Sequence, residues 1–136
     1  ALAAGVSRIR FVDPLDAVAY RHALAAADVL LVNEKPGVSA MAVPSKLTSY
    51  FDAGRAVVAA TDPSGISASE VDAAGAGLVV PAGSPAELLD AVLTLGADPV
   101  RAAELGASGR RYREQVLDES AALAQWERVL SAVAGL

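Results

Sequence analysis

The chain has 136 residues, of which 54% are hydrophobic, 4% aromatic and 20% charged, and its net charge at pH 7 is −5. This length fits one domain with a real core, and the charged fraction argues against disorder. The negative charge disfavours a global attraction to nucleic acid or to an anionic membrane. The lack of cysteine excludes disulfides and thiolate metal sites, and one histidine, His22, cannot make a His-rich metal site.

The sequence contains no run of about 18 apolar residues, so we expect no membrane-spanning helix. Its first residues, ALAAGVSRIR, lack the cationic start and apolar core of a signal peptide. We therefore expect a cytoplasmic location. The missing initiator Met suggests a fragment or a processed chain, and the alanine-rich composition is typical of GC-rich bacterial genomes.

The first third of the chain predicts a strand, a helix and a second strand. Residues 8–12, RIRFV, have the composition of a short strand, and Pro14 suits the first turn of a helix. Apolar residues at helical spacing predict that helix over 15–27. The continuous apolar run VLLV at 29–32 predicts a strand buried on both faces.

A long loop at 33–44 precedes the next predicted helix. Loops of this length without structure of their own are often functional. Ser45 is suited to cap a helix that runs to about Ala53, and Gly54 fits the position just past its end. The run AVVAA at 56–60 predicts another buried strand.

The sequence TDPSG then predicts a turn at 61–65. Ser67 and Glu70 match a capping box, in which the serine caps the helix and the glutamate reaches back. This helix is expected to end near Gly75. The run GLVVP at 77–81 predicts a fourth strand.

The last part of the chain predicts three helices. A second capping box at 84–87, with Pro85 in the first turn, predicts a helix to about Leu95. Asp98 and Pro99 begin a helix that is expected to reach about Leu117. The final helix is predicted over 119–134, with an apolar stripe formed by Leu123, Trp126, Leu130 and Val133.

Four alternations of strand and helix predict an α/β fold, a three-layer Rossmann-like domain with a parallel sheet between helices. We expect a single domain over residues 1–136. Ligands of such sheets bind outside the carboxyl ends of the strands. The loops that would leave those ends are 13–15, 33–45 and 61–67.

The best candidate site is the loop at 33–45. Gly37 permits a close approach of backbone and ligand, and Ser45 and Lys46 open a helix. Free amide groups and the helix dipole at such a start favour an anion such as phosphate, to which Lys46 would add a charge. The alternative is that Ser45 is only a helix cap and Lys46 only a solvated charge.

Other polar residues have simpler interpretations. Asp28 is expected to end a helix, and His22 to be packed or hydrogen-bonded in a helix. Glu34 and Lys35 lie in the long loop without a partner that the sequence reveals. Three arginines, Arg110, Arg111 and Arg113, share a predicted helix with Glu104 and Glu114, which favours a solvated face.

Three blocks of sequence, in order, resemble the C-terminal donor-binding half of group 1 glycosyltransferases of the GT-B fold. The first is RFVDPLDAVAYRHALAAADVLLV, the second VPSKLTSYFDAGRAVVAA and the third DPSGISASEVDAAGAGLVVPAGSPAEL. The "PSK" variant of the second block is most similar to enzymes of bacterial exopolysaccharide or O-antigen assembly. Together the blocks cover most of the chain.

The resemblance implies a site for a nucleotide diphosphate sugar, with neither a cofactor nor a metal. By position, Ser49 would face the ribose, and Ser45 and Lys46 would lie at the helix start. The remaining implied contacts are Gly37, Val38 and Ser39 near the phosphates and sugar, and Val12, Asp13 and Leu15 beside the base. Two departures stand out, because Met41 and Ser49 occupy the positions of the family's paired glutamates.

The resemblance further implies the donor-binding part of a retaining glycosyltransferase, which transfers a sugar to an acceptor in polysaccharide or glycoconjugate assembly. Its partner would be an N-terminal acceptor-binding domain that would precede Ala1, so this part alone is expected to be inactive. The full enzyme could associate with a membrane, and no nucleic acid is expected. The alternatives are a non-catalytic α/β regulatory or nucleotide-binding module and a fragment of a nucleotide-sugar epimerase.

Overall fold

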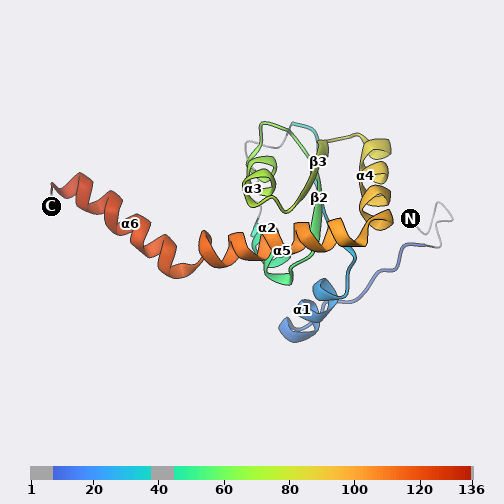
Figure 1. Ribbon diagram of the computed structural model, residues 1–136, viewed down its shortest axis with the longest axis horizontal. Coiled ribbons are helices and arrows are strands. Elements are labelled where there is room, and N and C mark those ends of the chain that lie inside the picture. The colour runs from blue at the N-terminus through green and yellow to red at the C-terminus, as the bar shows by residue number, and fades with distance from the viewer. Residues whose placement is uncertain (1–7, 38–44, 136) are drawn as a thin grey trace.

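The computed structural model describes residues 8–37 and 45–135 as a three-layer, Rossmann-like α/β fold, which confirms the predicted fold class (Figure 1). A parallel sheet lies between helices, and it has three strands within the described residues. The elements in chain order are α1 (Ala17–Ala25), β1 (Val29–Asn33), α2 (Ser45–Ala53), β2 (Ala56–Thr61), α3 (Ile66–Ala74), β3 (Gly77–Pro81), α4 (Pro85–Ala97), α5 (Pro99–Gln115) and α6 (Glu119–Ala134).

The sheet has the order β1-β2-β3, so β2 is its central strand. Leu30 pairs with Val57, and Val57 pairs in turn with Gly77. The three strands come from continuous apolar runs, and both of their pairings are parallel. All of them therefore end at one edge, which the chain leaves through the segments after Asn33, Thr61 and Pro81. Among them only β2 is buried along its whole length, and the prediction that residues 29–32 are buried on both faces is wrong, because Leu31 is 44% exposed.

The strand predicted at residues 8–12 is not formed. These residues are exposed and belong to no helix or strand, and Phe11 is 73% exposed. A strand exists only through the ladder that it joins, and this segment pairs with none of the described strands. The helix that follows is shorter than predicted, because Asp16 caps it by accepting hydrogen bonds from the amides of Val18 and Ala19.

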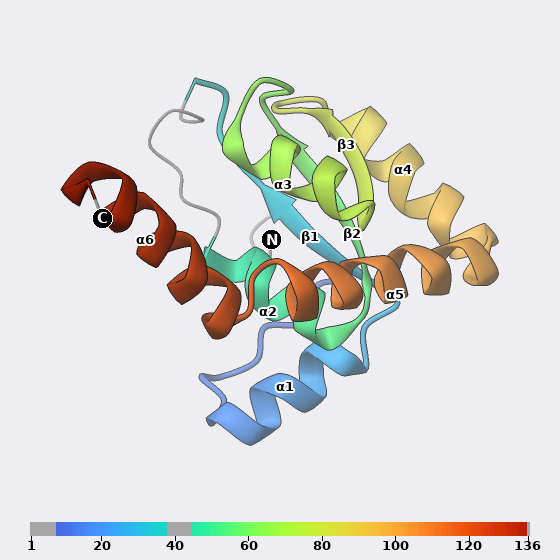
Figure 2. The same ribbon diagram turned by 60° about the vertical axis from the view of Figure 1, so that its left-hand side comes forward.

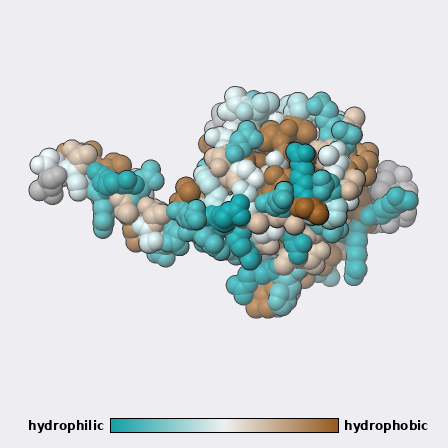
Figure 3. All heavy atoms as spheres, in the orientation of Figure 1, coloured by the Kyte–Doolittle hydropathy of each residue, from teal (hydrophilic) through white to brown (hydrophobic). Residues whose placement is uncertain are grey.

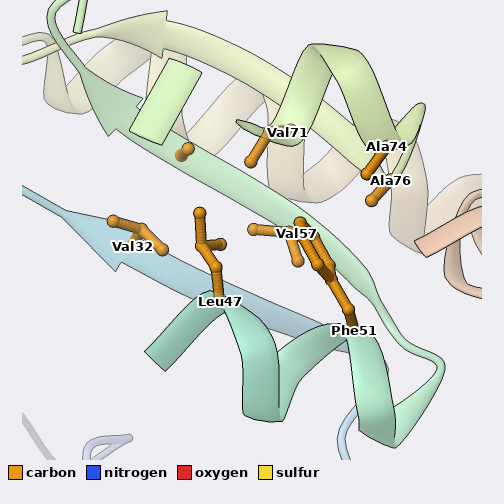
Figure 4. Packing of buried hydrophobic residues seen from close by; sticks show 8 residues of the cluster. Val32, Leu47, Phe51, Val57, Val71, Ala74 and Ala76 are labelled. Carbon is orange, nitrogen blue, oxygen red and sulfur yellow. The ribbon is translucent and has the colours of Figure 1, made fainter. Parts of the chain in front are cut away.

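The side chains of β2 alternate between two hydrophobic clusters, one on each face of the sheet. Val57 points toward α2 and α3, where it meets Leu47, Phe51 and Val71 (Figure 4), and Ala59 belongs to the same cluster. The opposite face packs against α4, and its buried members are Ala56, Val58, Ala60, Val80, Ala91 and Leu95. All six residues of β2 are buried. This burial on both faces is the main apolar contribution to the fold.

Helix α5 lies close to the other elements because it carries glycine at two contact points. An ideal Cβ on Gly106 would lie 2.2 Å from the carbonyl oxygen of Gly54, in the turn between α2 and β2. A Cβ on Gly109 would lie 2.9 Å from the Cβ of Ala76. One turn further along α5, the ring of Tyr112 meets that of Phe51 edge to face, with centroids 6.1 Å apart.

Two of the arginines predicted to form a solvated face instead bind backbone carbonyls. Arg110 donates from Nε and Nη2 to the carbonyl oxygen of Asp52, at 3.2 and 2.6 Å, and so satisfies an acceptor in the last turn of α2. Arg113 donates from Nη1 to the carbonyl oxygen of Leu117 at 3.1 Å. Sequence spacing could not reveal these contacts, because the partner of Arg110 lies in another helix.

The helix ends follow the sequence signals in part. Gly54 and Gly75 end α2 and α3 with positive φ angles of 66° and 54°, as predicted. Asp98 caps α5 by accepting a hydrogen bond from the amide of Arg101 at 2.9 Å. Ser84 is the residue before α4, but its side chain makes no capping hydrogen bond.

The predicted capping box of α3 is wrong. The structure places the start of α3 at Ile66, after Gly65, so Ser67 lies inside the first turn and is not its cap. The carboxylate of Glu70 instead interacts with the hydroxyl of Tyr112. The capping role predicted for Ser45 remains a prediction, because the residues before Ser45, the first residue of α2, lie outside the described ones.

Helix α6 extends away from the sheet and its covering helices (Figures 1 and 3). Asp118 caps its start by accepting a hydrogen bond from the amide of Ser120 at 3.1 Å. The predicted helix forms, but none of the residues of its apolar stripe is buried, and Trp126 is 64% exposed.

The close approach of α5 predicts the effect of adding one methyl group. Gly106→Ala should lower the free energy of unfolding by about 1–3 kcal/mol, because the methyl group would overlap the carbonyl of Gly54. The matched control is Gly96→Ala in α4, where an added Cβ has no heavy atom within 4 Å. This control should be neutral or should stabilise the fold by up to about 1 kcal/mol. Urea denaturation measures both, and equal effects would contradict the packing described for α5.

The pKa of the Tyr112 phenol lies above its ordinary value of 10.0, because burial disfavours the phenolate and because Glu70 is both a nearby negative charge and a hydrogen-bond partner. Since the folded-state pKa is raised, this group's contribution to stability is fully present below pH about 10 and is lost as the pH rises through the folded-state pKa. Denaturation between about pH 9 and 11 should therefore show a shallower alkaline loss of stability in Tyr112→Phe than in the unmodified chain. Parallel curves would contradict this.

Candidate functional site

The carboxyl edge of the sheet is the candidate site, because ligands of parallel α/β sheets bind outside this edge. The hydrogen-bond ladder continues one residue beyond the strands on both sides of Thr61. The amide of Glu34 donates to the carbonyl oxygen of Ala60 at 2.9 Å, and the amide of Ala82 donates to that of Thr61 at 3.0 Å. Figure 2 shows the segments after β1, β2 and β3 leaving the sheet at this common edge.

Glu34 is the centre of the polar contacts at this edge. Its Oε2 accepts a hydrogen bond from the Thr61 hydroxyl at 2.5 Å, and its Oε1 accepts one from the Ser67 hydroxyl at 2.5 Å. Thr61 is the last residue of β2, and Ser67 lies in the first turn of α3. The carboxylate therefore connects the ends of two adjacent strands with the start of the helix that follows the second strand.

Glu34, Thr61 and Ser67 differ in how far their side chains are buried. Thr61 and Ser67 are 0% and 2% exposed, whereas Glu34 is only half-buried. The two hydroxyls are thus held inside the protein, and the carboxylate lies between them and the solvent at the edge of the sheet. Hydrogen bonds to an ionised acceptor are the stronger class, so this arrangement fixes the orientation of the carboxylate.

The neighbouring loops pack against each other across the end of β2. Gly83, with φ of +80°, approaches Pro36 so closely that an ideal Cβ would lie 3.0 Å from the proline Cγ. Gly37 also has a positive φ, of +83°, but an added Cβ there would meet no heavy atom within 4 Å. Among the described residues, Gly37 is therefore free of the close packing that Gly83 makes.

The loop after β2 forms a tight turn before α3. The carboxylate of Asp62 accepts hydrogen bonds from the amide and the hydroxyl of Ser64, at 2.9 and 2.8 Å. Gly65, which precedes α3, offers no side chain for capping. The hydroxyl of Ser67 in the first turn of this helix donates to Glu34, which comes from a distant part of the sequence.

Only some of the predicted site residues lie at this edge. Ser45 and Lys46 are exposed at the start of α2, which follows β1 and so begins on the carboxyl side of the sheet. Gly37 lies in the segment after β1. Val38 and Ser39 lie outside the residues that the structure describes.

Ser49 lies in a different environment. It lines a cavity of about 290 Å³ together with α1 residues such as Tyr20 and His22 and with Arg110 of α5. Glu34 does not line this cavity. The predicted grouping of Ser49 with the loop at 33–45 is therefore not seen among the described residues.

Val12, Asp13 and Leu15 do not follow a strand end, because no strand forms at residues 8–12. They are exposed in the segment that leads to α1. The assumption that placed the loop 13–15 at the carboxyl edge is therefore wrong. Asp28 lines a second cavity, of about 330 Å³, with Arg55, just before the starts of β1 and β2.

Reasoning from sequence did not identify the group formed by Glu34, Thr61 and Ser67. The available signal was weak: a glutamate just after one buried strand, and a threonine that ends the next one. The assignment of Ser67 to a helix cap gave this residue a local partner and concealed its contact with Glu34.

Within residues 8–37 and 45–135, no group of three or more His, Asp or Glu side chains is arranged to hold a metal ion. In the same residues, no helix combines the length and the apolar character that crossing a membrane requires. Comparisons with protein-family models, with curated proteins and with solved structures gave no match to this chain.

The contact between Ser67 and Glu34 predicts a difference between two serines of α3. Ser67→Ala should lower the free energy of unfolding by about 1–3 kcal/mol, because it leaves a carboxylate oxygen with one partner fewer. Ser69→Ala removes an exposed hydroxyl from the same helix and should change stability by less than about 0.5 kcal/mol. Chemical denaturation at pH 7 separates the two, and a Ser67 variant as stable as the control would contradict the contact.

Proposed function

We propose that this chain is the donor-binding part of a retaining glycosyltransferase that takes a sugar from a nucleotide diphosphate and passes it to an acceptor. The observation that supports this best is how the three family-like sequence blocks map onto the fold. The first block contains α1 and β1 up to its last residue but one, the second contains α2 and β2 likewise, and the third contains α3 and β3 and reaches α4. Each block thus corresponds to a successive helix–strand unit of one parallel sheet.

The proposed site for the diphosphate is the start of α2. This helix begins on the carboxyl side of the sheet, and the amide groups of a first helical turn have no partner within the helix. Together with the helix dipole, they favour a negative charge. Lys46, which is exposed in this turn, adds a cation.

In the proposed reaction, the bond between the sugar and the diphosphate breaks, and negative charge develops on the leaving phosphate. The same sugar carbon forms a bond to the acceptor's hydroxyl oxygen, and the proton of that hydroxyl passes to the leaving diphosphate. Donors that are already oriented toward that charge lower the barrier without a costly rearrangement. The first turn of α2 and Lys46 would provide such donors in this chain. The acceptor would be held by a second domain, so we expect no transfer by these residues alone.

We further propose that the complete enzyme acts in bacterial polysaccharide or glycoconjugate assembly. The support is the similarity of the "PSK" segment at Pro44, Ser45 and Lys46 to enzymes of that kind. A cytoplasmic location, where nucleotide sugars are made, belongs to the same proposal.

Calorimetric titration with UDP-glucose and GDP-mannose tests donor binding. At least one of the two should bind, and Lys46→Ala should weaken that binding by about three- to tenfold, because it removes a cation from the phosphate site. The matched control is Arg55→Ala, which removes a cation just before the start of β2, at the opposite edge of the sheet. Binding of neither nucleotide sugar, or equal losses in the two variants, would contradict the proposed site.

A further inference from the structure

We propose that the Glu34 carboxylate is a specificity-determining contact that accepts hydrogen bonds from the vicinal hydroxyls of a sugar ring of the donor. This inference rests on the proposed function and adds to it a residue and a part of the ligand. The juxtaposition that carries it is the carboxylate of Glu34 between the hydroxyls of Thr61 and Ser67, at the carboxyl edge of the sheet.

The first argument is the use of buried polar groups. Among the described residues, Thr61 and Ser67 are the polar side chains that the core buries, and both donate to Glu34. Burying a hydroxyl is unfavourable unless it is hydrogen-bonded, and a backbone carbonyl would satisfy it as well as a carboxylate would. The fold instead directs both hydroxyls to one partly exposed anion, which holds that anion in a single orientation.

The second argument is the number of hydrogen bonds that the Glu34 carboxylate can accept. A carboxylate offers about four acceptor positions, two on each oxygen. The hydroxyls of Thr61 and Ser67 use one on each oxygen. The printed contacts thus leave acceptor positions on each oxygen that these two hydroxyls do not use, and Glu34 is only half-buried. A pair of adjacent ring hydroxyls matches two carboxylate oxygens, because each hydroxyl is a donor.

The third argument is the distribution of charge along the edge. The first turn of α2 carries Lys46 and favours an anion, whereas the first turn of α3 faces the negative charge of Glu34. A phosphate is therefore disfavoured beside Glu34, and a neutral, hydroxyl-rich group is favoured there. A nucleotide sugar has both parts, so it would place its phosphates toward α2 and a sugar ring toward Glu34.

The fourth argument concerns chemistry that the sequence otherwise lacks. Ser49, the residue expected to face the ribose, lines a cavity with α1 that Glu34 does not line. A hydroxyl of the ligand is held more strongly by a carboxylate than by a neutral oxygen. Glu34 provides a carboxylate on the proposed donor side of the sheet.

The test compares Glu34→Gln with the unmodified chain by titration of four ligands: pyrophosphate, 2′,3′-dideoxy-UDP, UDP and UDP-glucose, with the guanosine and mannose equivalents in parallel. Glutamine keeps the size and an acceptor oxygen but lacks the charge. The variant should bind pyrophosphate normally and should lose about tenfold in affinity for a ligand that supplies the hydroxyls.

The ligands also distinguish the two sugar rings. A loss for UDP but not for the dideoxy compound assigns Glu34 to the ribose. A loss for UDP-glucose that exceeds the loss for UDP assigns it to the transferred sugar. Unchanged affinities for all hydroxyl-bearing ligands, or an equal loss for pyrophosphate, would overturn the inference.

Two further variants separate a binding role from a structural one. Thr61→Val removes one of the hydroxyls that position Glu34. Like Glu34→Gln, it should weaken the binding of UDP more than the binding of pyrophosphate. Glu104→Gln makes the same chemical change as Glu34→Gln on an exposed position of α5 and should leave all affinities unchanged. If no nucleotide binds, the proposed function fails together with this inference; if nucleotides bind with equal affinity to both forms, only the inference fails.

Discussion

The burial of β2 on both faces is the constraint on which the rest of the fold depends. All six of its residues are buried, and the strand pairs with β1 on one side and β3 on the other. Its small residues allow α2 and α3 to pack on one face and α4 on the other. Strand β2 therefore has a neighbouring strand on each side and helices on both faces. Because of these contacts, its last residue, Thr61, reaches the carboxyl edge in a fixed position. The orientation of Glu34 follows from that position.

Helix α5 joins the two faces of this arrangement. Ala102 and Leu105 pack against the cluster under α4, whereas Tyr112 packs against the cluster under α2 and α3. Gly106 lies between these contacts, where the helix comes closest to the turn before β2. Arg110 then binds the last turn of α2. The same helix that closes the core therefore also fixes α2, whose other end forms the proposed phosphate site.

The sequence predicts the interior of the fold better than its edges. The strands at 29–33, 56–61 and 77–81 are built on short apolar runs bounded by turn residues, a pattern typical of strands in a parallel sheet. The segment at 8–12 has strand-forming residues, but a strand also needs a neighbour, which local composition cannot provide. The site was harder still. Glu34 and Ser67 are 33 positions apart, and the serine also fitted a local capping pattern that the structure does not contain.

Helix α6 is stabilised differently from α2, α3, α4 and α5, each of which contains buried residues. It has 16 residues, none of them buried, and its order depends on the cap from Asp118 and on Gly135 at its end. Helices of this length are only marginally stable without packing. The sheet and its covering helices, by contrast, share packing contacts that are lost together when the domain unfolds. Heating this chain should therefore not produce a single all-or-none transition: the C-terminal helix should fray turn by turn while the sheet and its covering helices remain intact.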